Sequence, residues 1–164
     1  MSYHDSKTPK ELRDSWCTPR KLFDHLNEEF CFVLDAAASD ENHLCDRYFT
    51  IDDDALNQSW EAGGYVWCNP PCSNSKAFVK KAESSCVGVV MLLPADTSTQ
   101  WFQDCVKSCD EIRFIIGGRI AFIHPETGKP VGGGKSGSLL MIWYPDMKQD
   151  CIFTYVTRKE IMGK

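Results

Sequence analysis

The chain has 164 residues, of which 43% are hydrophobic and 25% are charged, and these values are typical of one soluble globular domain. Its formal net charge of −5 argues against non-specific binding of nucleic acid by the whole surface. No apolar run approaches the roughly 20 residues of a membrane span and the N-terminus is no signal peptide, so a cytosolic setting is expected.

Strands and helices alternate along the first two thirds of the chain. The first fifteen residues are polar and are expected to be flexible. Thr18 can cap a helix, and apolar residues then recur at helical spacing. The elements expected in chain order are a helix over 18–29, strands over 31–35, 48–51 and 65–68, a helix over 73–85, a strand over 87–93, a helix over 97–108 and a strand over 112–116. This alternation predicts a parallel α/β sheet with helices on both faces.

The pattern changes after the last of these strands. A short strand over 120–123, a Gly-rich loop over 126–137 and a strand over 138–144 predict an antiparallel hairpin at the edge of the sheet. One more strand is expected over 152–156. The chain shows no internal repeat, and we therefore predict a single domain over 1–164.

The nine cysteines do not form a recognisable metal or disulfide pattern. Their number is odd, no CxxC pair occurs, and the histidines lie away from any metal-ligand spacing. Cys105 and Cys109 fall four residues apart on the apolar face of a predicted helix, where free cysteine acts as a small hydrophobe. We therefore expect reduced thiols and no metal site.

Asn69-Pro70-Pro71-Cys72 follows the apolar run 65–68 directly. Two prolines after a buried strand prevent the ladder from continuing and fix the chain in an extended turn. The side-chain carbonyl of Asn69 and the backbone carbonyl of Pro70 can each accept a hydrogen bond from an exocyclic NH2 group. The tetrapeptide is similar to the (Asn/Asp/Ser)-Pro-Pro-(Tyr/Phe) signature of amino-methyltransferases, whose aromatic residue stacks on a flipped base. Cys72 cannot stack in this way.

Polar side chains also terminate other predicted strands. Asp35, the Asp52-Asp53-Asp54 cluster and Asp96 each follow an apolar run. In open parallel sheets, ligands bind beyond the carboxyl ends of the strands. Carboxylates there suit a ligand that bears an ammonium group and a ribose diol, as S-adenosylmethionine does. On the residues alone, Asp35 could equally cap a helix, and the Asp cluster could form a solvated turn.

Several further segments extend this pattern along nearly the whole chain. They are Trp16-Cys17-Thr18-Pro19, Leu34-Asp35-Ala36-Ala37-Ala38-Ser39, Asp54-Ala55-Leu56 with Trp60, Trp67-Cys68-Asn69-Pro70-Pro71, Met91-Leu92-Leu93-Pro94-Ala95-Asp96-Thr97 and Gly118-Arg119-Ile120. Each is weak alone, but in this order and spacing the chain resembles the phage-type DNA N6-adenine methyltransferases, the Dam-like family of phages and prophages. A protein of this kind would work in the host cytoplasm.

The resemblance implies a small Rossmann-like fold that binds S-adenosylmethionine and methylates adenine in double-stranded DNA. The catalytic residues that it implies are Asn69, Pro70, Pro71 and Cys72. The cofactor-binding residues that it implies are Trp16, Thr18, Pro19, Asp35, Ala36, Ala37, Asp54 and Asn69. Asp35 matches a position against the methionine part of the cofactor, and Asp54 one that faces its ribose or adenine. In this chain, Ala37-Ala38-Ser39-Asp40 stands where the wider superfamily has a Gly-rich turn.

The segment 117–137 is the candidate DNA-recognition element. Basic residues outnumber acidic ones between 113 and 135, where Glu126 is the single acid. The candidate DNA-binding residues are Arg119, Lys129 and Lys135. Arginine there could contact guanine edges or phosphates.

Two alternatives to adenine methylation remain open. Because Cys72 removes the stacking residue, the chain could be a catalytically impaired relative that binds cofactor or DNA, unless Phe78, Trp67 or Tyr48 replaces the lost aromatic. Because Asn-Pro-Pro recognises NH2 groups generally, the acceptor could instead be cytosine N4 or a glutamine amide. A nucleophilic role for Cys72 is disfavoured, since methyl transfer to an amine needs no covalent intermediate.

Overall fold

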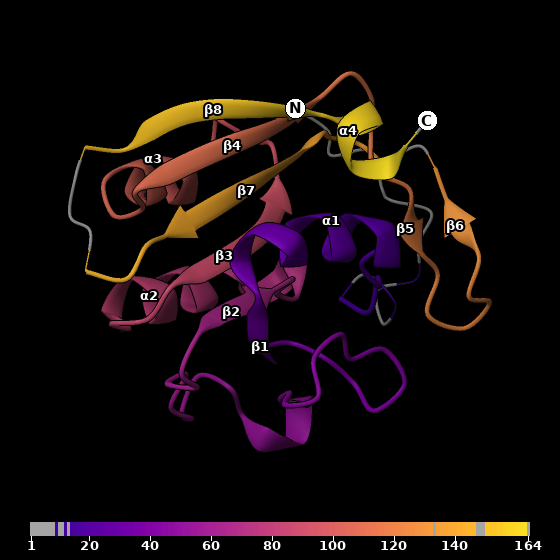
Figure 1. Ribbon diagram of the computed structural model, residues 1–164. Helices are drawn as coiled ribbons and strands as arrows, with labels where there is room; N and C mark the ends of the chain where they lie inside the picture. The colour runs from indigo at the N-terminus through magenta and orange to yellow at the C-terminus, as the bar shows by residue number, and fades with distance from the viewer. Residues whose placement is uncertain (1–8, 10–11, 13, 133, 147–149, 164) are drawn as a thin grey trace.

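The computed structural model describes residues 9, 12, 14–132, 134–146 and 150–163 (Figure 1). Its main sheet contains β1 (Phe32–Asp35), β2 (Tyr65–Cys68), β3 (Val89–Pro94), β4 (Glu111–Ile116), β7 (Ser138–Trp143) and β8 (Ile152–Thr157). The strands lie in the order β1-β2-β3-β7-β4-β8. All are parallel to one another except β7, which pairs antiparallel with both β3 and β4.

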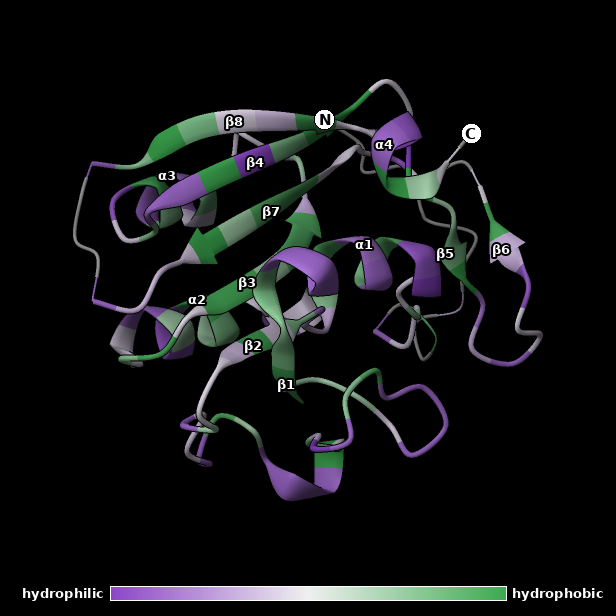
Figure 2. Ribbon diagram, viewed as in Figure 1, coloured by the Kyte–Doolittle hydropathy of each residue, from purple (hydrophilic) through white to green (hydrophobic). Residues whose placement is uncertain are grey.

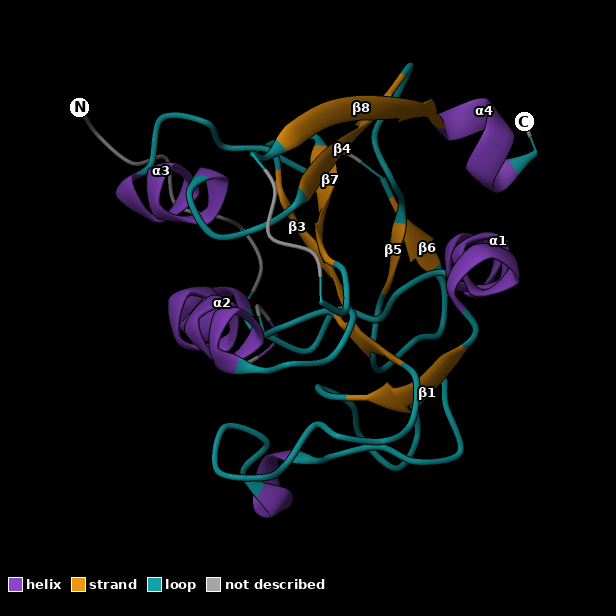
Figure 3. Cartoon of the chain, turned by 60° about the vertical axis from the view of Figure 1, so that its left-hand side comes forward, coloured by secondary structure: helices purple, strands orange, loops and turns teal. Residues whose placement is uncertain are grey.

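Helices cover both faces of this sheet. On one face lie α1 (Arg20–Phe30) and α4 (Arg158–Met162), and on the other lie α2 (Ser75–Ser84) and α3 (Gln100–Val106), as Figure 3 shows. Each face has its own buried cluster of apolar side chains. Residues of β2 alternate between the clusters, with Trp67 on the α1 side and Cys68 on the α2 side. Figure 2 shows the hydrophobic residues concentrated along β3 and β7 between these layers.

The predicted α/β class, the mostly parallel sheet and the Rossmann-like architecture are thus confirmed. A separate antiparallel pair, β5 (Phe122–Ile123) with β6 (Pro130–Val131), forms a hairpin, but β6 lies inside the predicted Gly-rich loop 126–137, so the strand partner predicted for 120–123, segment 138–144, is wrong. The final predicted strand is β8, which forms one edge of the sheet. No helix in the described part of the chain has the length and apolar character that a membrane crossing requires.

The position predicted for segment 138–144 is wrong. We expected it at the edge of the sheet, but β7 lies in the interior between β3 and β4. All six residues of β7 are buried. A strand that is apolar on both faces is stable only where both faces are covered. The composition of β7 therefore explains its interior position.

The strand predicted near 48–51 is also wrong, because only Tyr48 forms an isolated bridge, with Asp35. Residues Ile51–Asp53 form the 3-10 helix η2 instead. The Asp53 carboxylate accepts hydrogen bonds from the backbone N–H and the hydroxyl of Thr50, at 2.7 and 2.8 Å. Such local side-chain bonds compete with a strand ladder and favour a turn.

The two helices of the α2–α3 face are shorter than predicted. The helix expected over 73–85 begins with a 3-10 turn, η3 (Cys72–Asn74), before α2, and α3 covers only the middle of 97–108. Cys105 and Cys109 are buried in the core of this face, as predicted. Most of the first fifteen residues lie outside the described residues.

Candidate functional site

Asn69 stands at the carboxyl end of β2, a strand paired on both sides with parallel neighbours. Pro70 and Pro71 have no backbone N–H, so the sheet ladder stops at this point. Pro71 then precedes η3, and its carbonyl accepts a hydrogen bond from the Asn74 N–H at 2.9 Å. The chain therefore turns away from the sheet immediately after Asn69, and the turn leaves this side chain at the strand end.

The amide of Asn69 is held in one orientation. Its Nδ2 donates to the backbone carbonyl of Trp16 at 3.2 Å and to the hydroxyl of Thr18 at 3.1 Å. Among the described residues, none donates a hydrogen bond to Asn69 Oδ1 or to the Pro70 carbonyl. Asn69 Oδ1 and the carbonyl of Pro70, the next residue in the chain, are both acceptors and can each pair with an NH hydrogen.

The segment that orients Asn69 is residues 14–19, which we call the strap. At its start, the Asp14 carboxylate accepts hydrogen bonds from the N–H and hydroxyl of Ser73, at 3.0 and 2.5 Å. In its middle, Cys17 and Ile123 exchange two backbone bonds of 3.0 and 2.9 Å. The strap therefore connects the turn after Asn69 to the hairpin β5–β6.

Side-chain contacts strengthen the same connection. The Trp16 ring meets the His124 ring of the hairpin edge to face, with centroids 5.3 Å apart. Asn42, from the loop after β1, donates to the sulfur of Cys17 at 3.4 Å. Thr18 and Pro19 are buried where the strap enters α1. Three regions predicted separately to bind cofactor, base and DNA thus meet at the strap.

Asp35 ends β1 but faces the loop that follows. Its side chain is 3% exposed, and its two oxygens accept hydrogen bonds from the backbone N–H groups of Ala37 at 3.3 Å and Leu44 at 3.1 Å. Ala36 is fully buried beside it, with its N–H bonded to the Trp67 carbonyl. Burial raises the pKa of Asp35 to about 6, although these backbone donors oppose the increase. The carboxylate therefore shapes the loop 36–44.

The raised pKa of Asp35 makes stability depend on pH. The pKa of Asp35 is about 6 in the folded state and about 4 in an unfolded chain, so folding favours the protonated carboxyl. The protonated carboxyl therefore contributes to the stability of the folded state, fully below about pH 4, and this stabilisation is lost as the pH rises through about 6. We expect Asp35→Asn to lower the free energy of unfolding overall. Because asparagine does not titrate, the free energy of unfolding should also depend less steeply on pH in the variant, by about 1 kcal/mol per pH unit. Urea unfolding of both proteins between these limits measures the difference, and parallel profiles would contradict it.

The Asp52-Asp53-Asp54 cluster lies around η2, in the long segment beyond β1 at one edge of the sheet (Figure 1). The Asp53 carboxylate accepts hydrogen bonds from the backbone N–H and the hydroxyl of Thr50, and these bonds lower its pKa. Asp54 adopts a left-handed conformation with φ of 51°, and its carboxylate accepts from Asn57 Nδ2 at 2.5 Å. Asp52 and Asp54 are exposed. Their carboxylates, unlike that of Asp35, are directly accessible to a ligand.

Cys72 occupies an exposed position at the start of η3. Partial desolvation of its sulfur, together with the nearby negative charge of Asp14, raises the pKa of the Cys72 thiol. A neutral thiol is a weak nucleophile, which agrees with the expectation that Cys72 forms no covalent bond to substrate.

Neither Trp67 nor Phe78 replaces the missing aromatic face. Trp67 is fully buried and Phe78 is 7% exposed, both within the core. Tyr48 is half-buried, and its ring already stacks on His43 at 4.1 Å. Trp16, which is half-buried in the strap, is the aromatic residue whose backbone touches Asn69.

The candidate DNA-binding residues lie on and beside the hairpin β5–β6, and all three are exposed: Arg119, Lys129 and Lys135. The Arg119 guanidinium donates to the carbonyl of Gly134, so it also stabilises the loop after the hairpin. Arg113, from the same basic stretch, points elsewhere, because it pairs with Glu29 at 2.7 Å and Glu111 at 2.9 Å.

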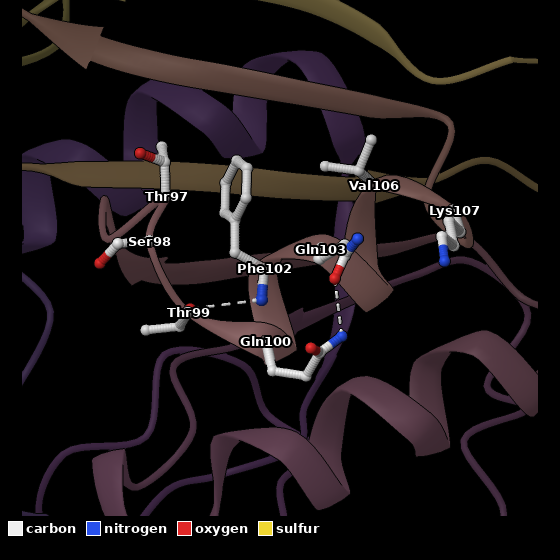
Figure 4. Close-up of a pocket in the computed structure, with 8 residues that line it drawn as sticks. All are labelled: Thr97, Ser98, Thr99, Gln100, Phe102, Gln103, Val106 and Lys107. Atoms are coloured by element: carbon white, nitrogen blue, oxygen red, sulfur yellow. Dashed lines mark hydrogen bonds between the residues drawn. The ribbon is translucent and has the colours of Figure 1, made fainter.

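A shallow pocket of about 450 Å³ lies along α3, away from these residues. Figure 4 shows its lining: Thr97, Ser98, Thr99, Gln100, Phe102, Gln103, Val106 and Lys107. None of the predicted catalytic or cofactor-binding residues borders it. Within the described ranges, no group of three or more His, Cys, Asp or Glu side chains is placed to hold a metal ion.

Asp14 and Ile123 contribute to this site, and neither was predicted from the sequence. Asp14 lies in a polar stretch that we expected to be flexible, yet it is bonded to Ser73, 59 positions away in the sequence. The Cys17–Ile123 bridge spans an even longer separation. Neither contact follows from periodicity or spacing, since both depend on the tertiary fold.

Comparisons with known proteins give consistent results. A family model described as DNA N-6-adenine-methyltransferase (Dam) matches residues 5–164. A DNA N-6-adenine-methyltransferase of Escherichia phage T1 is 37% identical over 158 residues, which cover 85% of this chain and 66% of that protein. A DNA N-6-adenine-methyltransferase of Haemophilus phage HP1 (strain HP1c1) is 37% identical over 166 residues, which cover 97% of this chain and 95% of that protein. The putative methyltransferase YfdM of Escherichia coli K12 is 38% identical over 68 residues, covering 38% of this chain and 75% of that protein.

Proposed function

The chain belongs to the DNA N-6-adenine-methyltransferase (Dam) family, and from this premise we propose that it transfers a methyl group from S-adenosylmethionine to N6 of a flipped adenine in double-stranded DNA. The observation that carries the proposal is the pair of acceptors at the end of β2, Asn69 Oδ1 and the Pro70 carbonyl. Both suit an exocyclic NH2 group, which has two hydrogens to donate.

These acceptors would activate the adenine nitrogen. Its lone pair is delocalised into the ring, which makes the amino group a poor nucleophile. Hydrogen bonds from both N–H groups to Asn69 and Pro70 favour a more tetrahedral nitrogen, whose lone pair is available for in-line attack. S-adenosylmethionine supplies the electrophilic methyl group on its sulfonium. Formation of the N–C bond would break the methyl–sulfur bond and leave the sulfur as a neutral thioether, and the extra proton on nitrogen would leave to solvent. The residues act by positioning and electrostatics.

The residues near the carboxyl ends of the strands fit this cofactor. Exposed carboxylates of Asp52 and Asp54 suit ribose hydroxyls or an ammonium group. We propose that Asp35 contributes through the loop 36–44, whose Ala37 and Leu44 N–H groups it holds. The full set of residues proposed to line the cofactor is Trp16, Thr18, Pro19, Asp35, Ala36, Ala37, Asp54 and Asn69.

Methyl transfer from labelled S-adenosylmethionine to double-stranded DNA tests the proposal. After digestion of the DNA to nucleosides, the label is expected in N6-methyl-2′-deoxyadenosine. Label in N4-methyl-2′-deoxycytidine would make cytosine the acceptor, whereas label in added protein and not in DNA would indicate a glutamine amide. Tight cofactor binding without methyl transfer to any DNA would favour the alternative raised by Cys72, a catalytically impaired relative that binds cofactor or DNA.

We propose that the DNA lies against the hairpin β5–β6, where Arg119, Lys129 and Lys135 are exposed. Replacing all three with glutamine is expected to weaken DNA binding at every sequence. The slope of log affinity against log salt should fall by about one for each phosphate contact that is lost. Fluorescence anisotropy over a salt series measures both quantities.

A matched control removes the same charge from the face of the sheet that α2 and α3 cover. Lys76, Lys80 and Lys107 are exposed on α2 and after α3. Glutamine at these three positions is expected to leave the salt slope close to that of the parent protein. If the control loses binding while the hairpin variant keeps it, the DNA contacts the α2–α3 face instead.

A further inference from the structure

We propose that the Trp16 carbonyl and the Thr18 hydroxyl form a clamp that sets the orientation of the Asn69 amide and makes position 69 selective for asparagine over aspartate. The clamp rests on the proposed function, because its purpose is to present Asn69 Oδ1 to an amino group. It makes Thr18 a positioning residue, since its hydroxyl acts through Asn69.

The two ends of an amide differ in what they can bond. The NH2 end of Asn69 has two hydrogens, and the clamp provides two acceptors, at 3.2 Å from Trp16 and 3.1 Å from Thr18. The Trp16 carbonyl can only accept, so it determines which end of the amide faces the strap. A flipped amide would lose the bond to Trp16 and place two carbonyl oxygens against each other. Oδ1 is therefore held toward the substrate side before any ligand binds.

The acceptors of the clamp are themselves fixed in place. Cys17, which lies between them, is bonded to Ile123 through both its N–H and its carbonyl. Thr18 is 8% exposed, and the next residue leads into α1. Asp14 ties the start of the strap to Ser73. Pre-organised second contacts of this kind keep a catalytic group in its productive geometry.

Aspartate at position 69 would not fit the same clamp. The general signature allows Asp in place of Asn, because a carboxylate also accepts from an amino group. In this chain, an ionised carboxylate in the Asn69→Asp variant would have no hydrogen to donate, and one of its oxygens would face the Trp16 carbonyl. The protonated carboxyl could donate to Trp16 and still present its other oxygen. The clamp therefore predicts that Asn69→Asp works only in its protonated form.

Kinetics of Thr18 variants test the positioning role. Thr18→Val removes the acceptor and is expected to lower kcat about fivefold, the equivalent of one hydrogen bond. Its KM for S-adenosylmethionine should change by less than about twofold, because the hydroxyl bonds to Asn69 and valine keeps the size of the side chain that lines the cofactor. Thr18→Ser keeps the hydroxyl and should restore kcat. A raised KM for the cofactor with unchanged kcat would overturn the clamp and assign Thr18 to the cofactor alone.

The pH profile of Asn69→Asp tests the selectivity. Its activity relative to the parent protein is expected to rise about tenfold for each unit of falling pH until the carboxyl is protonated. Other titratable groups on the surrounding elements are Asp14, Cys17, Asp35, Cys72 and His124. Because both proteins share them, the ratio isolates position 69. A flat ratio between about pH 5.5 and 8.5, or full activity of Asn69→Asp at neutral pH, would overturn the selectivity.

A stability measurement separates failure of the clamp from failure of the proposed function. Repulsion from the Trp16 carbonyl should raise the pKa of the introduced carboxyl in the folded state, so Asn69→Asp should lose stability relative to the parent as the pH rises. Thermal unfolding measures this without any turnover. Parallel unfolding profiles would overturn the clamp, whereas a pH-dependent gap in a protein that methylates no DNA would support the clamp and count against the proposed function.

Discussion

Replacing Asn69 with alanine is expected to lower kcat for methyl transfer by roughly 100- to 1,000-fold, the cost typical of removing one pre-organised group that stabilises a transition state. The variant keeps the Pro70 carbonyl but loses the acceptor that Trp16 and Thr18 orient. The amino nitrogen would then be bound through one hydrogen alone. Single-turnover transfer of labelled methyl groups, with cofactor and DNA both saturating, measures the effect on the chemical step.

Asn74 provides a matched control for this variant. It is an exposed asparagine on the same turn, at the end of η3, and its side chain makes no cap bond to α2. Asn74→Ala is expected to retain the kcat of the parent protein. If the kcat of Asn69→Ala remains within about threefold of the parent value, the loss is smaller than the roughly fivefold effect of one hydrogen bond. The acceptor pair is then not the catalytic centre. Thermal unfolding of both variants checks that the strap remains in place.

Introducing an aromatic ring at position 72 is expected to raise the rate. Flipping a base out of a duplex costs a few kcal/mol, and stacking on an aromatic side chain offsets about 1 to 3 kcal/mol of it. Cys72 is exposed at the start of η3, so a larger side chain meets solvent there rather than the core. Cys72→Tyr should therefore raise kcat/KM for DNA by roughly 10- to 100-fold.

The comparison with serine separates stacking from removal of the thiol. Cys72→Ser has neither a thiol nor a ring and is expected to give no such gain. The decisive readout is kcat/KM for DNA, with the affinity for S-adenosylmethionine measured in parallel. Equal increases for tyrosine and serine would mean that the thiol hinders the reaction and that no stacking position exists at residue 72.

Much of the fold could be predicted because its strands are short apolar runs that stop at Gly, Pro or polar residues. The run Tyr65–Cys68 was predicted with the bounds of β2. The interior position of β7 could not be predicted in the same way, because hydrophobicity indicates that a strand is buried but not which neighbours bury it. The segment 48–51 has strand-like composition, but the local hydrogen bond from the Thr50 N–H to the Asp53 carboxylate favours the 3-10 helix η2 over a strand.

The part of the candidate site that consists of consecutive residues could be predicted from the sequence. Asn69, Pro70 and Pro71 fall at a strand end because their own backbone properties end the strand. The partners of Asn69 come from a segment more than fifty residues earlier, and no local pattern reveals such a pair. Likewise, the sequence shows that Asp35 ends a strand but does not show that its carboxylate faces inward to Ala37 and Leu44.

The interior position of β7 has a consequence for the order in which the protein can assemble. β3 and β4 have no direct pairing with each other, and β7, which lies between them, is made later than both. During synthesis, the sheet cannot close until residues 138–143 leave the ribosome, and contacts so distant in sequence form slowly. The strap needs Ile123 as well as Asn69, so the site matures only after most of the chain is available. A nascent or prematurely terminated chain that lacks Ile123 would carry the Asn-Pro-Pro turn without the completed strap.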